Sequence, residues 1–336
     1  MLNFQDLPDE VVLKVLSYSE TKDLISCRQV SKKIRRISHD GTLWVTANFE
    51  KKIVKTELLE MILGMGCRNL SLHHSTILGH LSSNIKSQLS VLNFSQPECD
   101  EKHDDCDCDE NTVVLGELLS SCCLLKHLVL EGVLLMPTMA VGICKNGKTL
   151  QTLNLKRSFL DDLSDDNPDG TLAYCYLQEI IKCCQELKEV DLAYVNDAEG
   201  LTDDDLELLA KNISPKVEKL NLASSYIEDD HVKILLRRCN KIKALTLEPN
   251  WITDDSLTNI SQCLNLTLEE LSLGTTGYDP GTFGVGHNGA ISFTGILELK
   301  SMPRLKILNL YHKKDDGEEI QNLRQYLPHL MIKGVL

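Results

Sequence analysis

One cluster in the sequence holds residues of the types that bind zinc. Cys99, His103, Cys106 and Cys108 lie within a single short segment, and thiolate and imidazole groups are ligands that zinc prefers in proteins. Zinc sites usually take their ligands from paired CxxC-like motifs, which this segment lacks. The sequence therefore leaves two interpretations open, a zinc site and a solvated acidic loop. It favours the acidic loop, so we expect no bound metal.

Two other segments match ligand-binding motifs by letter. Residues 165–170 follow the first half of a calcium-binding loop, but Tyr176 stands where such a loop needs a glutamate. Residues 284–289 spell the GxGxxG pattern of dinucleotide-binding sites. That motif must directly follow a strand, whereas the nearest predicted strand ends at Leu273. Both segments are predicted to be surface loops.

The familiar hydrolase and protease motifs do not occur. The chain contains no GxSxG or HExxH string. The adjacent His73 and His74 are expected to be surface residues rather than a catalytic pair. We therefore expect no catalytic residues and no cofactor, and a protein that is not an enzyme.

An aliphatic frame of the form LxxLxL recurs along most of the chain and must position any binding residues. The frame begins at Leu89, Leu125, Leu150, Leu187, Val217, Ile242, Leu268, Leu305 and Leu327. Most steps are 22 to 37 residues, which leaves room for one strand, one turn and one helix. Each unit of that size buries its aliphatic face only by stacking on its neighbours. The frame predicts an α/β leucine-rich-repeat solenoid, curved, with parallel strands on the concave face and helices on the convex face.

Composition and charge agree with a binding protein of this kind. The 336 residues are 42% hydrophobic but only 5% aromatic, which suits a long aliphatic core. The net charge of −14 argues against nucleic acid as a partner, because such proteins neutralise phosphates with clustered Lys and Arg. Glu131 and Pro137 interrupt the most apolar window, so we expect no membrane span. No signal peptide is expected either, which predicts a protein that stays inside the cell.

Residues 3–44 have a different pattern, that of three short amphipathic helices. Pro8 suits the first turn of a helix, in which Val12, Val15 and Leu16 are expected to form one apolar stripe. Ser31 is expected to cap the third helix. Because so short a module buries little surface of its own, we expect it to dock on a partner as well as on the next domain.

This module resembles an F-box. The resemblance is carried by Leu7-Pro8-x-Glu10, Leu16, Asp23-Leu24, Val30 and Leu43-Trp44. An F-box followed by cysteine-type leucine-rich repeats is similar to the substrate receptors of SCF ubiquitin ligases, most of all to their S-phase-kinase-associated subgroup. The resemblance implies contacts with a Skp-family adaptor by Leu7, Pro8, Glu10, Leu16, Leu24 and Val30.

The resemblance also implies a function that needs no chemistry from this chain. The F-box would bind the adaptor, and through it cullin and RING subunits, while the repeats hold a protein target for ubiquitination and proteasomal degradation. Targets of that subgroup are cell-cycle regulators. The sequence leaves open whether the target is phosphorylated and whether a small kinase-associated accessory subunit assists. The resemblance implies a location in the nucleus and cytoplasm. The alternative function is a stand-alone repeat scaffold or inhibitor without a ubiquitin role.

These patterns divide the chain into three parts. We expect an F-box over residues 3–48, a linker helix with a degenerate first repeat over 49–88, and leucine-rich repeats over 89–336. Three inserts lengthen single repeats and are predicted to be surface loops. They are an acidic insert at 96–112, a second at 161–171 and a Gly-rich insert at 274–292.

Candidate target-binding residues lie between and beyond the frame leucines. Residues that alternate with the leucines face away from the core, and large apolar residues recur four positions beyond the last frame leucine. The candidates are His127, Lys156, Arg157, Phe159, Lys219, Tyr226 and Trp251. Rigid rings beside Arg are typical of binding hot spots, and Arg suits a phosphate or carboxylate. The alternative is that the rings only cover loop backbone.

Charged clusters are expected mainly at helix surfaces. Residues 202–205, 228–230 and 253–255 combine Thr and acids where helices should begin, so they are predicted to cap those helices and complement their dipoles. The basic run 32–36 could be a nuclear import signal. Its place on a predicted helix favours a solvated helix face instead.

Overall fold

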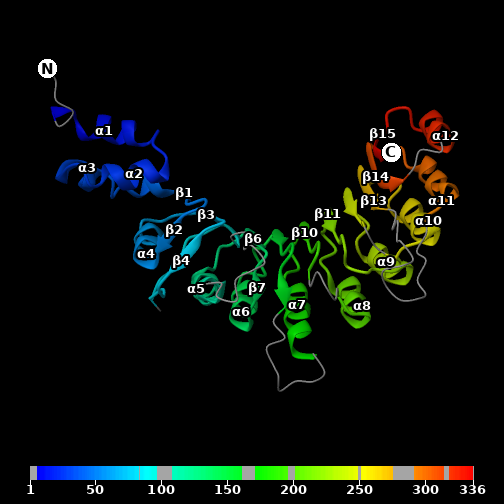
Figure 1. The fold of residues 1–336 in the computed structure, drawn as a ribbon, viewed down its shortest axis with the longest axis horizontal. Coiled ribbons are helices and arrows are strands. Elements are labelled where there is room, and N and C mark those ends of the chain that lie inside the picture. Colours follow the sequence, from blue (N-terminus) through cyan, green and yellow to red (C-terminus); the bar gives the residue numbers. More distant parts are fainter. Residues whose placement is uncertain are drawn as a thin grey trace. The chain divides into compact units, whose positions relative to one another are not determined.

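The computed structural model describes residues 6–82, 84–96, 108–160, 171–195, 201–248, 251–274, 291–313 and 318–335. The chain folds into two compact units, Met1–Leu150 and Gln151–Leu336. Figure 1 shows the elements in chain order. Both units are built from strands that alternate with helices, and the first unit begins with a helical module.

Three short helices and one turn of 3-10 helix form this N-terminal module. They are α1 (Asp9–Leu16), α2 (Thr21–Cys27), α3 (Lys32–Ile37) and η2 (Gly41–Trp44). The Ser31 hydroxyl accepts a hydrogen bond from the Ile34 amide at 3.2 Å, which confirms the predicted cap of α3. Trp44 is fully buried, and its indole N–H donates to the Ser38 carbonyl at 2.6 Å. A large buried ring whose polar group is satisfied holds this small core together.

The remainder of the first unit consists of repeats around one parallel sheet. Its strands pair in the order β1 (Thr46–Asn48), β3 (Asn69–His73), β5 (Val91–Ser95), β6 (His127–Glu131). A separate parallel pair joins β2 (Ile53–Lys55) to β4 (Thr76–Leu78). The other elements are α4 (Thr56–Gly64), α5 (Cys108–Ser121), α6 (Pro137–Lys145) and β7 (Leu134–Leu135).

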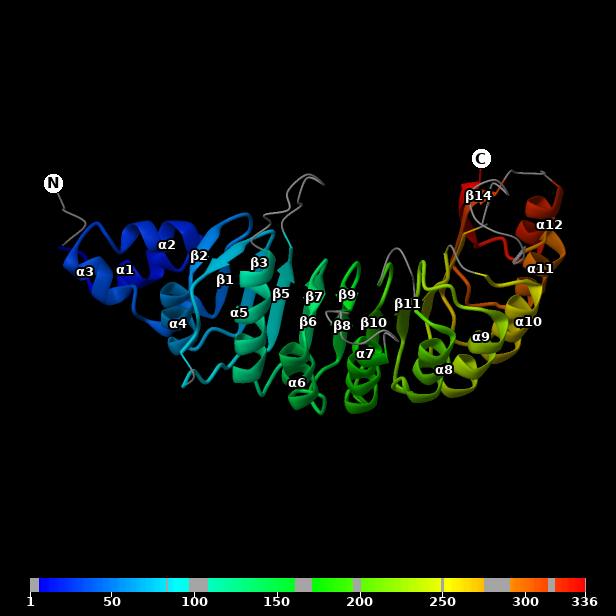
Figure 2. The ribbon, with the colours of Figure 1, turned by 60° about the horizontal axis from the view of Figure 1, so that its bottom comes forward.

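The second unit repeats the same arrangement. Its parallel strands pair in the order β8 (Thr152–Asn154), β10 (Glu189–Asp191), β11 (Lys219–Asn221), β12 (Ala244–Thr246), β13 (Glu270–Gly274), β14 (Ile307–Lys313), β15 (Met331–Val335). The other elements are β9 (Phe159–Leu160), α7 (Thr171–Cys183), α8 (Asp203–Asn212), α9 (Asp229–Arg238), α10 (Asp254–Cys263), α11 (Phe293–Leu297), η3 (Glu298–Ser301) and α12 (Glu318–Tyr326). Helices α8, α9 and α10 lie along one side of these strands in Figure 2.

The aliphatic frame explains which strand residues face the core and which face the other side of the sheet. In β11 and the residue after it, Leu220 and Leu222 are 2% and 0% exposed, whereas Lys219 and Asn221, which alternate with them, face the opposite side of the sheet. The same alternation recurs on the neighbouring strands, which pair in register. Stacking of parallel strands and helices around one aliphatic core confirms the predicted leucine-rich-repeat solenoid.

Buried amide side chains tie neighbouring repeats of the first unit together. Asn146, only 1% exposed, donates to the carbonyls of Cys122 and Gly142 at 3.2 and 2.9 Å. Its own side-chain oxygen accepts from the Leu125 amide at 3.1 Å. Asn111 likewise accepts from the Ile77 amide at 2.7 Å. Backbone groups that the repeat turns leave unpaired are satisfied in this way.

In the second unit the predicted helix caps form, and the acids also bond forward to the next helix. Thr202 caps α8 by accepting from the Asp205 amide at 3.3 Å, and Thr253 caps α10 by accepting from the Asp255 amide at 3.2 Å. Asp229, the first residue of α9, accepts from the Thr253 amide and hydroxyl at 2.9 and 2.6 Å. Its carboxylate also accepts from the amide and the hydroxyl of Ser256.

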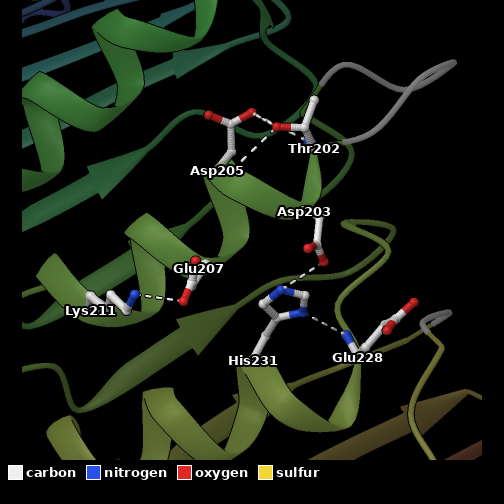
Figure 3. A network of polar contacts seen from close by, with 7 residues as sticks. All are labelled: Thr202, Asp203, Asp205, Glu207, Lys211, Glu228 and His231. Atoms are coloured by element: carbon white, nitrogen blue, oxygen red, sulfur yellow. Dashed lines mark hydrogen bonds and ion pairs between the residues drawn. The ribbon is translucent and has the colours of Figure 1, made fainter.

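The same forward contact recurs in the repeats on either side. Asp203, the first residue of α8, lies 3.0 Å from Nε2 of His231 in α9 (Figure 3). His231 is 5% exposed, and its Nδ1 accepts from the Glu228 amide at 3.4 Å, so its Nε2 carries the proton given to Asp203. Asp254 of α10 accepts from the Ser292 amide at 2.8 Å at the start of α11. These first-position aspartates link successive helix N-termini.

The fully buried cysteines pack as small apolar residues. Cys67, Cys184 and Cys239 have no exposed surface. Desolvation raises the pKa of Cys67 and of Cys239 to about 11, and the pKa of Cys184 to about 12. Thiols with such pKa values stay protonated and unreactive at neutral pH.

Candidate docking surfaces

Helix α1 has two apolar faces, of which one is turned to solvent. Val12 and Leu16 are 0% and 3% exposed and form the inner face. Val11, Val15 and Tyr18 are 44%, 47% and 77% exposed, and their spacing places them along one side of the helix and its C-terminal turn. Lys14 lies 4.9 Å from the centre of the Tyr18 ring. We call Val11, Val15 and Tyr18 the outer face of α1.

This arrangement corrects the expected apolar stripe of the first helix. Val12 and Leu16 point inward as predicted, but Val15 lies with Val11 on an adjoining side of the helix that is partly exposed. The sequence contains the signal for this second face, because residues 11, 15 and 18 keep helical spacing apart from residues 12 and 16.

The residues expected to contact an adaptor differ in exposure. Leu16 and Leu24 are each 3% exposed, so their side chains hold the module's helices together. Pro8 and Glu10 are exposed, Leu7 is half-buried and Val30 is 70% exposed. The adaptor contacts expected of the six residues stay a prediction, and Leu16 and Leu24 also pack the module.

Ion pairs fix the start of α1 against α3. Asp9 lies 2.5 Å from an Arg36 nitrogen and 3.6 Å from Lys33 Nζ. Lys33 Nζ also donates to the Leu7 carbonyl at 2.5 Å. Two cations of the basic run 32–36 thus have structural partners in the module. They also hold the outer face of α1 in one orientation.

The candidate residues on the repeats are divided between the two units. His127 is exposed at the start of β6 in the first unit, and the others belong to the second unit. Lys219 pairs with Glu189 of the neighbouring strand at 2.8 Å, and this hydrogen bond raises the pKa of Lys219. Lys219 is therefore already engaged by its own sheet.

The cations after β8 are placed by a turn. The Asn154 side chain accepts from the Lys156 amide at 2.8 Å, and Asn221 makes the same contact with the Ala223 amide at 3.1 Å. Arg157 follows with a φ of 55° and an exposed side chain. The Phe159 side chain lies outside the described part of the structure. Asn154 and Asn221 alternate with the frame leucines, and their side chains are thus used to form the repeat turns.

Two of the candidate aromatics meet. The Tyr226 and Trp251 ring centres are 5.1 Å apart, with planes tilted by 45°, which is a favourable arrangement for aromatic side chains. Trp251 is 37% exposed and Tyr226 is half-buried. The Trp251 amide donates to the Ile227 carbonyl at 3.1 Å. Stacking of adjacent repeats has brought these two rings onto one ledge.

The expectation that the chain holds no phosphate-loop GKS or GKT string is wrong, but the structure gives the string that is present a packing role. Residues 142–149 spell GxxxxGKT, whose function depends on a helix N-terminus that presents its amides to phosphate. Here the string begins inside α6 and continues past its C-terminal end, where the helix dipole disfavours anions. Gly142 is needed for packing, because a Cβ there would lie 2.7 Å from Leu119 Cβ. The string belongs to the repeat scaffold.

The other motifs give no described site. Cys99, His103 and Cys106, and the motifs at 165–170 and 284–289, lie outside the described residues, as does the Cys108 side chain. Among the side chains that are described, no three His, Cys, Asp or Glu residues gather as metal ligands would. No helix in the described ranges is long and apolar enough to cross a membrane.

A helical module with an outward apolar face, followed by stacked repeats, defines a protein built for binding. Residues 4–50 match the family model described as F-box-like. The chain thus combines an F-box-like domain with leucine-rich repeats.

Two solved structures were found to be similar to this chain. A chain from the crystal structure of the yeast Rad7–Elc1 complex shares 17% identity at a TM-score of 0.51, covering 96% of this chain and 87% of that chain. A leucine-rich-repeat protein of Leptospira interrogans shares 15% identity at a TM-score of 0.43, covering 85% of this chain and 58% of that one. The first likeness concerns the fold alone.

Proposed function

We propose that this protein is the substrate-recognition subunit of an SCF-type cullin-RING ubiquitin ligase. The observation that supports this best is the outer face of α1, which lies within the segment that matches the F-box-like family. Two valines and a tyrosine left at the surface of so small a module are suited to burial against another protein. The partner proposed for this face is a Skp-family adaptor, which brings the cullin and RING subunits.

The proposed mechanism is proximity. The module binds the adaptor while the repeats bind the target, so that target lysines are held near a charged ubiquitin-conjugating enzyme. Linking two binding events in this way raises the effective concentration of the reacting groups without any catalytic group from this chain. The consequence of the proposed activity is proteasomal degradation of the target.

The proposed target is a cell-cycle regulator, in line with the S-phase-kinase-associated subgroup that the chain resembles. Phosphorylation of the target and a small kinase-associated accessory subunit are parts of this proposal, as is a location in the nucleus and cytoplasm. Arg157 is the exposed cation best placed to meet a phosphate, because its side chain is exposed whereas Lys219 is paired.

The Leu7→Ala/Pro8→Ala double variant is expected to lose co-purification with a Skp-family adaptor. Its fold should persist, because the backbone carbonyls of Leu7 and Pro8, which accept from Lys33 and from the Val11 and Val12 amides, are kept. The measurement is capture of the purified adaptor by the full chain, with circular dichroism as the check on folding. Leu266→Ala, at a 63% exposed position in the repeats, is the control that should bind normally. Full capture by the double variant would count against the adaptor role and in favour of a stand-alone repeat scaffold.

A further inference from the structure

Glu248 carries a half-buried carboxyl group two residues after the end of β12. It follows the core residue Leu247 and shares the solvent side of the sheet with Thr246. Its Oε2 is buried and has no hydrogen-bond partner within the part of the chain that the structure describes. Desolvation, the sole cause, raises its pKa to about 7.

A carboxyl oxygen in this state is costly to a folded protein. An unsatisfied buried polar group costs about 1–3 kcal/mol, and native structures satisfy nearly all such groups. Thr246, two residues earlier on the same face of the sheet, and its strand partners Asn221 and Ser272 carry no charge. A bound donor from outside would therefore complete the site, and a cationic donor would do so best.

Tyr226 and Trp251 follow β11 and β12, and Glu248 comes between β12 and Trp251 in the chain. Strands β11 and β12 pair Lys219 with Ala244. Tyr226 and Trp251 are separated by the same number of residues, so they occupy equivalent positions in adjacent repeats. Trp251 comes three residues after Glu248, a separation of at most about 10 Å along the backbone. A half-buried carboxyl and two partly exposed rings therefore occupy the ends of two adjacent repeats.

The turn after β11 contains two residues with left-handed backbone. Arg157, Tyr194 and Ser224 occupy equivalent turn positions and have φ values of 55°, 58° and 57°. Tyr226 adds a second left-handed residue, with a φ of 60°, two positions after Ser224. This conformation costs a non-glycine residue about 1–2 kcal/mol, and strain of this kind is concentrated at binding sites. Here the left-handed backbone of Tyr226 orients its ring toward Trp251.

We propose that Glu248, Tyr226 and Trp251 form a binding site for an arginine side chain of a partner protein. The carboxylate accepts hydrogen bonds from the guanidinium group, while the ring faces stack against its plane. The net charge of −14 favours approach of a basic segment. This inference rests on the proposed function in one respect, since the segment would belong to the target held by the repeats.

The probe that tests the site is the fluorescein-labelled peptide acetyl-(Gly-Arg)4-amide, with binding to the full chain followed by fluorescence anisotropy. Glu248→Gln and Trp251→Ala are each expected to weaken binding at least about tenfold, since one lost contact of about 1.4 kcal/mol has that effect. The control Glu298→Gln removes the same charge from an exposed position outside the site and should change binding less than about twofold. The matched peptide with neutral citrulline in place of Arg should bind no better than background.

The protonation state of Glu248 provides a second readout. Because its pKa is about 7 in the free protein, the carboxylate is the minor form at pH 6 and the major form at pH 8. Binding of the arginine peptide should strengthen by up to about tenfold over that range in the unaltered chain. In Glu248→Gln this dependence should disappear.

Equal binding by Glu248→Gln and the unaltered chain would overturn the proposed site. So would an equal loss in Glu248→Gln and Glu298→Gln, which would indicate a general charge effect, or tight binding of the citrulline peptide. The adaptor is absent from this measurement, and capture of the adaptor by Glu248→Gln should be normal. Failure of the arginine site is therefore distinct from failure of the ubiquitin-ligase proposal.

Discussion

A chain with Val11→Asp and Val15→Asp is expected to bind the Skp-family adaptor at least about tenfold more weakly than the unaltered chain. Each valine has about half of its surface left to bury, which is worth about 0.7 kcal/mol, and loss of two such contacts corresponds to that factor. An aspartate carboxylate in the interface adds a further desolvation cost. The measurement is the dissociation constant for purified adaptor.

The two valines are partly exposed, so their replacement should affect binding rather than folding. Val11 and Val15 are 44% and 47% exposed, so their replacement should leave the module folded, with a change in stability within about 0.5 kcal/mol. The matched control is Leu266→Asp, at an exposed apolar position of the repeats, which should leave adaptor binding unaltered. Undiminished affinity of the double variant, with the module folded, would show that the outer face of α1 is not the docking surface.

Replacement of Asp229 by Ala is expected to lower the free energy of unfolding of the second unit by about 3 kcal/mol. Its carboxylate accepts from Thr253 and Ser256 of the next repeat, and hydrogen bonds to charged groups are each worth about 1.5–3 kcal/mol. Their loss also leaves donors at the N-terminus of α10 unsatisfied. Urea-induced unfolding, followed by circular dichroism, measures the change.

The neighbouring residue provides the control for this prediction. Asp230 is exposed in the same first turn of α9, so Asp230→Ala should cost less than about 1 kcal/mol, the usual value for a charge near a helix end. If the two variants lose the same stability, the acids act only on the dipole of their own helix. The forward link to α10 would then contribute nothing.

The fold could be predicted from the sequence because the frame is local and repeats. Each LxxLxL copy places Leu residues at the spacing of a half-buried strand, and the copies at Val217 and Ile242 pair in register as β11 and β12. Packing within one repeat depends on residues close in the chain. The predicted caps at Ser31, Thr202 and Thr253 form for the same reason.

Features that depend on a neighbouring repeat could not be predicted in this way. The sequence shows Asp229 at a helix start, but its partners Thr253 and Ser256 belong to the next helix. Glu248 carries no motif, and its unusual pKa arises from burial on the face of the sheet. On α1 the spacing shows two apolar faces, one with Val12 and one with Val15, but not which of them is buried.

The most direct test of the central proposal is the cellular half-life of a partner protein that binds the repeats. It is compared in cells that contain either the unaltered chain or the chain with Val11→Asp and Val15→Asp. Both chains should capture the partner equally, because the substitutions lie outside the repeats. We expect a longer half-life of the partner in cells that contain the variant chain. An identical half-life in both cells would contradict the proposal that the helical module delivers repeat-bound proteins for ubiquitination.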